Sequence, residues 1–343
     1  MTFHYTNDIY PSFKNSIFQL LKYQYKLYYN IKVKYKILNL KFTFKYVIVP
    51  TFDHFDKIFS ILGSPFQNTP FFGIYISPKF HRNTMGIGAK SRSDFLYFYL
   101  FKKMLSSKNL IKVLVVDPLF KEYINQFNFK PANKLIFFNE PINLTGNTTK
   151  EKARELLGIP KDSNVILIYG DISKRKGVIQ IANSIRLLDQ KYILLIAGTI
   201  NNNLKDFFES DFIANLIEDR KIVISNGFKN EVEEFNYFIS SDVISVAYES
   251  SFTSSSGVYY QACSIGKPVL VNKCGLLYWL VQKYNNGISI NLNDTESIAK
   301  DIEKLFNDKS IYTHYSSQSK LIAKNHSPDQ FINSILTAIN FIP

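Results

Sequence analysis

The residues best suited to chemistry lie in two loops, each placed between an apolar run and a helical pattern. Residues 170–177 contain three consecutive cations, Lys174, Arg175 and Lys176, and residues 253–257 read Thr-Ser-Ser-Ser-Gly. Cationic side chains and the free N–H groups at the start of a helix both attract anions. The two loops therefore predict a site for a phosphate-bearing ligand. In the alternative interpretation, the cations are a solvated helix start and the serines only cap the following helix.

The elements around these loops predict a parallel sheet. Short apolar runs alternate with helical patterns, and polar loops follow the runs. This alternation is typical of a doubly wound α/β fold, in which buried parallel strands have continuous apolar sequences. The predicted strands are residues 164–169, 192–197, 222–225, 243–247, 269–272 and 287–290. The predicted helices are residues 149–157, 178–187, 205–218, 230–240, 258–264, 294–307 and 310–342, the last one broken at residues 325–328.

The first half of the chain shows a shorter version of the same alternation. Residues 11–28 predict an amphipathic helix, and residues 31–50 are strand-like because lysines alternate there with apolar residues. The first clear parallel strand arrives near Tyr46, which is late for such a domain, so we expect a domain that is reduced or whose start is truncated. Further strands are predicted at residues 71–76, 111–116 and 134–139, and helices at residues 51–62, 93–105 and 119–127.

The order of motifs between about residues 156 and 305 resembles the C-terminal half of GT-B glycosyltransferases of family 4, also called glycosyl transferases group 1. The resemblance is carried by LLGIPKDSNVILIYGDISKRKGVIQIANSI, ILLIAG, FKNEVEEFNYFISSDVISVAY and SSGVYYQACSIGKPVLVNKCG. It implies a GT-B fold, in which two Rossmann-like, doubly wound parallel-sheet domains face each other across a cleft. On this basis we expect a reduced acceptor-side domain at residues 1–145, a nucleotide-sugar-binding domain at 146–325, and a helix at 326–343 that returns to the first domain.

The resemblance also implies an activity. Members of the family move a sugar from a nucleotide diphosphate sugar with retention of configuration, usually without a bound metal. We therefore expect no cofactor and no metal, and as partners a nucleotide sugar and a glycan or lipid-linked acceptor. The expected role is the biosynthesis of surface polysaccharide or another glycoconjugate. Without a metal, positioned cations and helix N-termini must offset the charge of the departing diphosphate.

The family's diphosphate-binding cations map onto the basic loop only in part. Lys176, directly before Gly177, matches the lysine of the family motif. The family's arginine, which follows the glycine at the strand end, is missing, because Asp171 occupies that position. We expect Arg175 or Lys174 to take over its role.

The family also carries two glutamates eight residues apart, of which the first meets the donor sugar and the second holds the ribose hydroxyls. The second position is Gln261 here, and an amide can still hydrogen-bond a diol, without charge assistance. The first position falls by spacing on Thr253, with Glu249 nearby as a substitute. The loop is about two residues longer than usual. The phosphate groups are expected on Ser255, Ser256 and Gly257.

The acceptor-side histidine of the family lies in a loop after a central strand of the first domain. His81, in the sequence PKFHRN, is the best match and our predicted catalytic residue. Asp53 and His54, which follow the strand ending at Pro50, are the second choice. In the alternative interpretation these histidines are structural or surface residues, as lone histidines often are.

The amino-terminal segment is strongly basic. Residues 1–50 hold eight lysines and one acidic residue, in a chain of formal net charge +13. Lysines interleaved with Tyr and Phe at residues 14–45 suit an anionic membrane surface, nucleic acid, or simply a solvated face. We expect no nucleic acid, since no known recognition motif is present. The aromatic residues 93–105 predict either a core helix or one that dips into a membrane.

The expected location is the cytoplasm, peripheral on the inner face of a membrane. The chain has two cysteines, Cys263 and Cys274, without a CxxC spacing, and no apolar signal segment opens it. The altered residues at 171, 253 and 261 support a second hypothesis, a catalytically weak protein that binds a nucleotide sugar or partners an active transferase. A third, a GT-B epimerase, lacks evident groups for proton abstraction.

Overall fold

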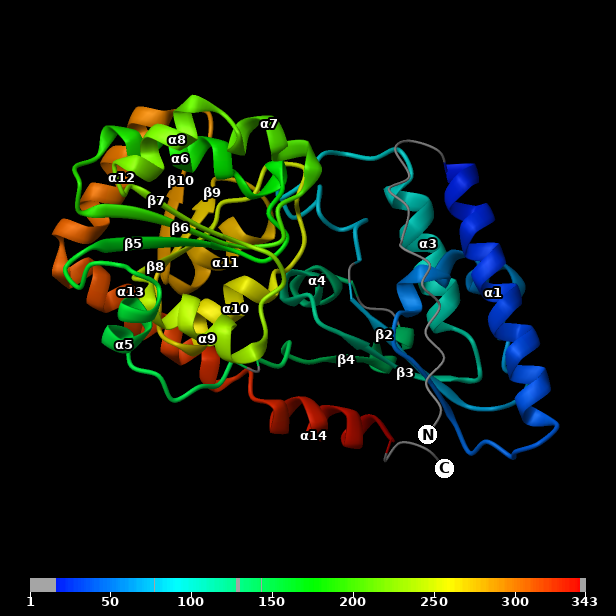
Figure 1. The fold of residues 1–343 in the computed structure, drawn as a ribbon. Helices are drawn as coiled ribbons and strands as arrows, with labels where there is room; N and C mark the ends of the chain where they lie inside the picture. Colours follow the sequence, from blue (N-terminus) through cyan, green and yellow to red (C-terminus); the bar gives the residue numbers. More distant parts are fainter. Residues whose placement is uncertain (1–16, 77, 128–129, 143, 340–343) are drawn as a thin grey trace.

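The computed structural model describes residues 17–76, 78–127, 130–142 and 144–339. They form two α/β domains, each built around a parallel sheet with helices packed against it (Figure 1). The predicted pair of parallel-sheet domains is confirmed. No helix in the described part of the chain is both long and apolar enough to span a membrane.

The first sheet has four parallel strands in the order β1-β2-β3-β4, so each strand lies beside the next one in the chain. The strands are β1 (Val47–Val49), β2 (Phe71–Tyr75), β3 (Leu110–Val115) and β4 (Leu135–Phe137). The helical elements of this domain are α1 (Ile17–Asn39), η1 (Phe52–His54), α2 (Asp56–Leu62), α3 (Asp94–Leu105), α4 (Pro118–Ile124) and η2 (Lys130–Lys134).

The core of the first domain is aromatic. The rings of Phe52, Phe59 and Phe71 pack edge to face with centroids 5.1 to 5.7 Å apart, a favourable geometry for aromatic pairs. Helix α3 buries Phe101 on this core, whereas Phe95 on its other side is 84% exposed. One face of α3 is therefore a core face, and the opposite face remains available to solvent or another surface.

Helix α1 (Ile17–Asn39) corrects the prediction of a strand-like segment at residues 31–50. It has 23 residues, and only β1 in that segment is extended as a strand. Tyr28 and Tyr35 lie two turns apart and are buried, so the helix needs few inward residues and its lysines can point outward. The part of the predicted helix before residue 17 lies outside the described residues.

The second sheet has six parallel strands in the order β10-β9-β8-β5-β6-β7. They are β5 (Asn164–Tyr169), β6 (Tyr192–Gly198), β7 (Ile222–Asn226), β8 (Val243–Val246), β9 (Val269–Asn272) and β10 (Gly287–Ile290). These bounds agree with the predicted strands to within one residue. From the central β5, the chain first adds β6 and β7 on one side and then β8, β9 and β10 on the other.

Helices cover both faces of this sheet (Figure 1). They are α5 (Lys150–Leu156), η3 (Lys174–Lys176), α6 (Val178–Leu187), η4 (Asn202–Leu204), α7 (Lys205–Phe208), α8 (Asp211–Glu218), α9 (Glu231–Ser240), α10 (Gly257–Ser264), α11 (Gly275–Tyr284), α12 (Thr295–Asn307) and α13 (Lys309–Lys324). Helix α11 and the short 3₁₀ turns η3 and η4 were not predicted from the sequence. The predicted helix 205–218 is divided into α7 and α8.

The chain passes between the domains twice, and the two passages are hydrogen-bonded to each other. The backbone N–H of Ile142 donates to His326 O at 2.9 Å, and Asn139 Nδ2 donates to Asn325 O at 2.7 Å. After the second passage, α14 (Pro328–Ile339) lies beneath the first domain (Figure 1). Its Phe331 packs against Phe138, with ring centroids 5.2 Å apart.

Candidate functional site

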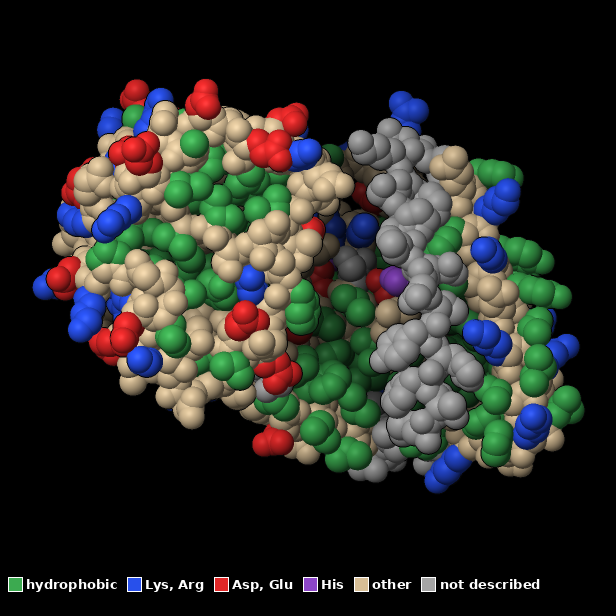
Figure 2. Space-filling model, in the orientation of Figure 1, with side chains coloured by type: hydrophobic (Ala, Val, Ile, Leu, Met, Phe, Trp, Pro, Cys, Tyr) green, Lys and Arg blue, Asp and Glu red, His purple; other side chains and the backbone are tan. Residues whose placement is uncertain are grey.

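The candidate site lies where the strand order of the second sheet reverses. Strands β5 and β8 are neighbours there, although the chain visits β6 and β7 between them. In open α/β sheets, ligands bind beyond the carboxyl ends of the strands at such a switch point. The basic loop 170–177 follows β5 and the hydroxyl-rich loop 248–257 follows β8. Figure 2 shows a hollow between the two lobes with basic side chains inside it.

Lys176 is a buried cation at the end of β5. Its side chain is 4% exposed, Nζ donates to the carbonyl oxygen of Tyr169, and it lies 5.4 Å from the ring centroid of Tyr248. Burial, together with the nearby Arg175, lowers the pKa of Lys176 to about 8. Because a buried ammonium is costly unless it is paired, this side chain is well placed to accept an anionic ligand.

Arg175 joins the basic loop to the hydroxyl-rich loop. Its guanidinium carbon lies 5.2 Å from the ring centroid of Tyr248 and 4.7 Å from that of Phe252. Its carbonyl oxygen accepts a hydrogen bond from the N–H of Glu249 at 2.8 Å. Of the two cations proposed to replace the missing arginine, the structure places Arg175 beside this loop, whereas Lys174 is exposed.

A glycine allows the two loops to approach so closely. Gly177 has φ +65°, and a Cβ atom there would lie 2.6 Å from the carbonyl oxygen of Ala247, at the end of β8. Any larger residue would push the basic loop away from β8. The Lys-Gly pair of the loop therefore positions Lys176 and admits the backbone of the neighbouring strand.

The hydroxyl-rich loop leads directly into α10. Ser256 is its N-cap residue, but its side chain makes no capping hydrogen bond, and its Oγ lies 3.0 Å from Tyr248 Oη instead. Ser255 Oγ donates to Glu140 Oε2 at 2.9 Å, and Gly257 is exposed in the first turn. The interpretation that these serines only cap the helix does not hold for Ser256.

Arg82 is a functional candidate that the sequence analysis missed. It lies in the loop after β2, is 6% exposed, and reaches across to the second domain. Its Nη2 donates to Ser254 Oγ at 3.2 Å, and its Nη1 donates to Thr253 Oγ1. The first domain thus contributes a cation to the loop that was predicted to hold phosphate. The signal available in the sequence was only its position beside His81.

The structure places His81 in the core of the first domain. Its side chain has no exposed surface and packs against Phe120, with ring centroids 5.1 Å apart. Its Nε2 lies 3.3 Å from Asp117 Oδ2, while Asp117 Oδ1 caps α4. His54, the second choice, is half-buried at the carboxyl end of β1 together with Asp53. In this conformation, His54 has accessible surface and His81 has none.

A pocket of about 550 Å³ opens beside Lys176 at the carboxyl ends of β5, β6 and β7. Phe228 at this pocket is 88% exposed, so its ring is open to a ligand. The lining residues are Tyr169, Gly170, Asp171, Gly198, Thr199, Phe228, Lys229, Asn230, Glu231 and Glu234.

Gln261 contacts Glu234, which lines this pocket and is a second residue that the sequence analysis missed. Gln261 Nε2 donates to Glu234 Oε1 at 2.8 Å. Burial and the carboxylate of Glu234 raise the pKa of Tyr169, which also lines the pocket. Glu234 stands in an acidic first turn of α9, where sequence alone does not distinguish it from a residue that stabilises the helix dipole.

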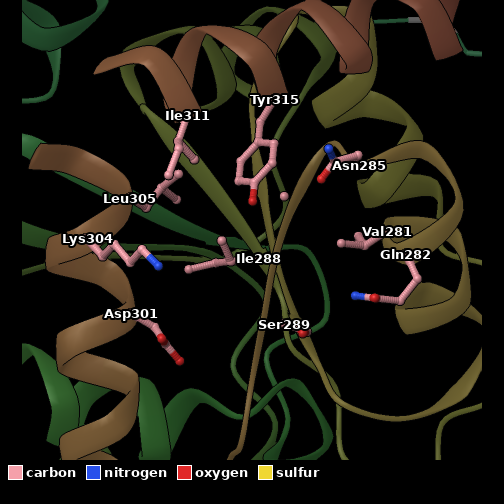
Figure 3. A pocket seen from close by; sticks show the side chains of 11 residues that line it. Val281, Gln282, Asn285, Ile288, Ser289, Asp301, Lys304, Leu305, Ile311 and Tyr315 are labelled. Atoms are coloured by element: carbon pink, nitrogen blue, oxygen red, sulfur yellow. The ribbon is translucent and has the colours of Figure 1, made fainter. Parts of the chain in front are cut away.

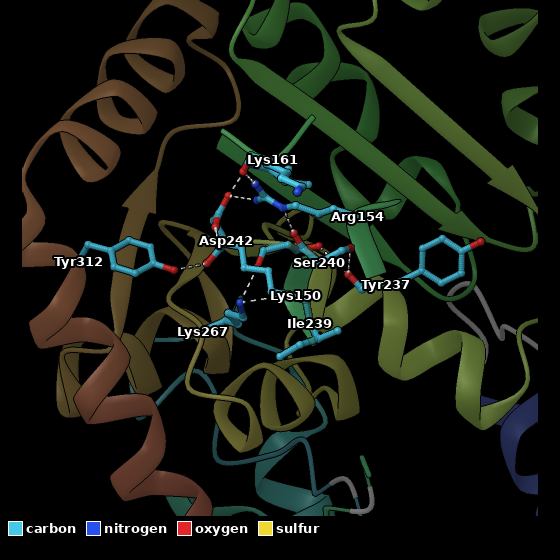
Figure 4. Close-up of polar contacts among 11 residues, drawn as sticks. Lys150, Arg154, Lys161, Tyr237, Ile239, Ser240, Asp242, Lys267 and Tyr312 are labelled. Atoms are coloured by element: carbon cyan, nitrogen blue, oxygen red, sulfur yellow. Dashed lines mark hydrogen bonds and ion pairs between the residues drawn. The ribbon is translucent and has the colours of Figure 1, made fainter. Parts of the chain in front are cut away.

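The amino ends of β5 and β8 carry a separate charged network, shown in Figure 4. Asp242 Oδ2 accepts from Arg154 Nη2 and from the N–H of Val165, both at 2.8 Å. Lys150 pairs with Asp242 Oδ1, and Lys267 Nζ donates to the carbonyl oxygen of Ser241 at 2.6 Å. This network joins α5 to the sheet at the end opposite to the pocket.

Two other cavities lie away from the basic and hydroxyl-rich loops. One of about 360 Å³ lies at the free edge of β10, between α11, α12 and α13, and Figure 3 shows Lys304 and Tyr315 around Ile288 there. Another, of about 690 Å³, lies at the carboxyl ends of β3 and β4, where the ion pair between Lys283 and Glu122 (2.6 Å) joins the domains. Among the described residues, no group of three His, Cys, Asp or Glu side chains is arranged to hold a metal ion.

Comparison with known proteins identifies a family. The model of the family described as "Glycosyl transferases group 1" matches residues 149–330, which include the basic loop, the hydroxyl-rich loop and the pocket. An uncharacterized glycosyltransferase of Methanocaldococcus jannaschii is 24% identical over 212 residues, covering 60% of this chain and 53% of that protein. The capsular polysaccharide biosynthesis glycosyltransferase CapM of Staphylococcus aureus is 24% identical over 262 residues, covering 72% and 66%. The chain thus spans about half to two thirds of the length of these relatives.

Solved structures show the same fold. The Anabaena protein HepE, solved in complex with UDP, superposes with a TM-score of 0.65 at 14% identity, covering 95% of this chain and 84% of HepE. Sucrose-phosphate synthase from Thermosynechococcus elongatus superposes with a TM-score of 0.64 at 17% identity, covering 92% and 80%. The predicted GT-B architecture is therefore confirmed.

Proposed function

The chain belongs to the glycosyl transferases group 1 family, and from this premise we propose that it is a retaining glycosyltransferase. It would move a sugar from a nucleotide diphosphate sugar to a glycan or lipid-linked acceptor. The observation that carries the proposal is that the pocket and the buried lysine meet at one residue. Gly170 lines the pocket, and a Cβ atom placed on it would lie 3.3 Å from Lys176 Nζ.

Because the pocket and the buried lysine adjoin, the bound donor would have a defined orientation. The pocket is lined by an exposed aromatic ring and by acidic groups, which suit a base and neutral hydroxyls better than a diphosphate. The cations Lys176, Arg175 and Arg82 stand on the side of the hydroxyl-rich loop, which suits the diphosphate. The nucleoside would therefore occupy the pocket, and the sugar would point toward the first domain.

The cations would act when the bond between the anomeric carbon and the diphosphate breaks. The acceptor oxygen forms the new bond to that carbon, the nucleoside diphosphate leaves with the electron pair, and its departing oxygen takes up the proton of the acceptor hydroxyl. Charge that develops on the leaving group is stabilised by groups already in position, which is worth most in a buried site. We propose that Lys176, Arg175 and Arg82 supply this stabilisation without a metal, with N–H groups at Gly257 as a further donor.

Several sequence predictions about the donor and acceptor remain part of this proposal. On the donor side, Thr253, Ser255, Ser256 and Glu249 lie in the loop that Arg82 and Arg175 contact, so we keep them as candidates for the sugar and phosphates. On the acceptor side, His54 is accessible. His81, as a buried neighbour of Asp117, would act only if the domain rearranged.

We propose that the protein works in the cytoplasm at the inner face of a membrane, in surface polysaccharide or glycoconjugate biosynthesis. The outward side of α1 mixes exposed apolar residues with lysines. Lysines attract anionic head groups, and apolar side chains beside them can enter the head-group region. The exposed apolar residues of α1 are Phe18, Tyr25, Tyr29, Val33, Ile37 and Leu38.

A panel of nucleotide diphosphate sugars tests the donor proposal. We expect at least one to raise the melting temperature, because a ligand well above its dissociation constant stabilises the folded state by about 2–4 kcal/mol. The same sugar should be transferred to lipid or glycan extracts. A panel without any stabilising compound would refute the donor site.

A catalytically weak binding protein is the second candidate. It is favoured by the absence of a carboxylate at Thr253 and Gln261, and by the complete burial of His81. Stabilisation by a nucleotide sugar without hydrolysis or transfer to any extract would favour this candidate over the enzyme.

A further inference from the structure

The proposed function assigns no role to the carboxylate of Glu234. It stands in the first turn of α9, is half-buried, and lines the pocket at the ends of β5, β6 and β7. A charged group at this depth needs a partner to offset its loss of hydration. Gln261 is one such partner, because its amide donates to Oε1 at 2.8 Å.

The amide contact orients the carboxylate without using up its capacity. An ionised carboxyl group accepts about four hydrogen bonds, two on each oxygen. Gln261 occupies one of these positions, and the hydroxyl of Tyr169 also interacts with the carboxylate. With these two contacts made, about two acceptor positions remain for donors in the pocket, the number of hydroxyls that a cis-diol offers.

The surroundings of Glu234 fit a nucleoside rather than a free sugar phosphate. Phe228, 88% exposed at the same pocket, offers a flat apolar surface of the kind on which a base stacks. Lys176 lies on the far side of Gly170, where the phosphates of the same ligand would reach. Asp171, exposed at the pocket, would disfavour placing a phosphate there.

We propose that Glu234 binds the ribose 2′,3′-diol of the donor nucleotide and that Gln261 positions the Glu234 carboxylate. This inference rests on the proposed function. The carboxylate is thus supplied by α9, whereas the resemblance implies one on α10 at position 261. The two side chains form a pair of one carboxylate and one amide, with the carboxylate on α9 and the amide on α10. The loss of the glutamate at position 261 then need not mean loss of ribose recognition.

Matched nucleotides test this pair. Isothermal titration would compare UDP with 2′-deoxy-UDP, and GDP and ADP with their 2′-deoxy forms. We expect the ribonucleotide to bind about tenfold to hundredfold more tightly, the effect of losing a hydrogen bond to a charged group. In Glu234→Gln this ratio should fall to about threefold or less, with the melting temperature as a check on folding.

The exchanged variant makes the test specific to the pair. Gln261→Glu alone places two carboxylates in contact, so we expect it to weaken binding of the ribonucleotide. The double variant Glu234→Gln with Gln261→Glu restores one amide and one carboxylate. We expect it to recover the preference for the ribonucleotide, which a merely structural role of Glu234 would not predict.

Glu231→Gln is the matched control, since Glu231 is exposed, acidic and lines the same pocket. An equal loss of the preference in Glu231→Gln would refute a direct contact by Glu234 and indicate a general effect of charge. A wild-type protein that binds deoxynucleotides as well as ribonucleotides would overturn this inference and leave the proposed function intact. Binding of none of these nucleotides, with no sugar donor in the panel, would overturn both.

Discussion

The two ends of the second sheet each hold a buried lysine, but the charged groups around the two lysines differ. At the amino end, Lys267 donates to backbone carbonyls near the ion pair of Asp242 with Arg154. At the carboxyl end, Lys176 donates to the carbonyl of Tyr169 and has Arg175 as its neighbour. Burial lowers the pKa of both lysines to about 8.

What differs is the charge that the chain itself supplies. At the amino end, a carboxylate that is 9% exposed forms ion pairs with Arg154 and Lys150, so part of the positive charge is offset within the fold. At the carboxyl end, the cations Lys176, Arg175 and Arg82 gather around a loop of hydroxyl groups. Similar pKa shifts thus occur in two different surroundings, and a perturbed lysine alone does not identify a site.

Arg154→Met should have the largest effect, and on folding. It leaves the buried Asp242 without its 2.8 Å partner, and breaking such a pair costs about 3–5 kcal/mol. Chemical denaturation would measure the loss. Nucleotide affinity of the folded fraction should not change, because the network lies at the opposite end of the sheet from the pocket. A fall in affinity without a loss of stability would contradict the comparison.

Lys176→Met and Lys267→Met form a matched pair, since each removes the charge and keeps the length of a buried side chain. We expect Lys176→Met to weaken nucleotide diphosphate binding about 100-fold, or about 2.8 kcal/mol. Lys267→Met should leave that affinity unchanged. It should lower the unfolding free energy by about 1–3 kcal/mol, because the carbonyls of Ser241 and Ile239 lose their donor. Titration calorimetry and denaturation of both variants would check the pair.

The pH dependence should be smaller and have opposite signs for folding and binding. The folded pKa of Lys176 is about 8, below the ordinary value of 10.5, so above pH 8 the unfolded chain binds more protons. This group therefore adds to stability as pH rises from 8 to 10.5. Anion binding needs the charged ammonium, so affinity for a nucleotide sugar should fall about tenfold between pH 7 and 9, or about 1.4 kcal/mol.

The two variants sharpen this measurement. In Lys267→Met the affinity should still fall with pH, since the titration of Lys267 is not linked to ligand binding. In Lys176→Met the affinity should no longer fall with pH. If affinity stayed flat to pH 9 in the wild type, Lys176 would not be the group that meets the diphosphate.

The strands of the second domain could be predicted from the sequence because they are buried on both faces. β5 and β6 are continuous apolar runs, and a buried parallel strand leaves few other possibilities for such a run. The helical conformation at the end of α1 could not be predicted in this way. Lysine alternates with Ile31, Val33, Tyr35 and Ile37, which is the pattern of a half-buried strand, yet the segment is helical with Tyr35 inward and Val33 and Ile37 exposed.

The site could be predicted only where it is local in the chain. Lys176 stands in a loop whose glycine and neighbouring strand are close in sequence. Arg82 meets Thr253 across 171 residues, and Glu234 meets Gln261 across 27. No periodicity or spacing encodes such contacts, because they depend on how the two domains and two helices come together.

The position of α14 has a consequence for the order in which the molecule can form. Its Phe331 and Ile335 cover Phe72, Leu114 and Phe138 on the first sheet. During synthesis at roughly 5–20 residues per second, the ribosome adds Phe331 about 10–40 seconds after Phe138. For that interval one side of the first sheet is an open apolar surface. The second domain is therefore synthesised before α14 can cover this side of the first sheet.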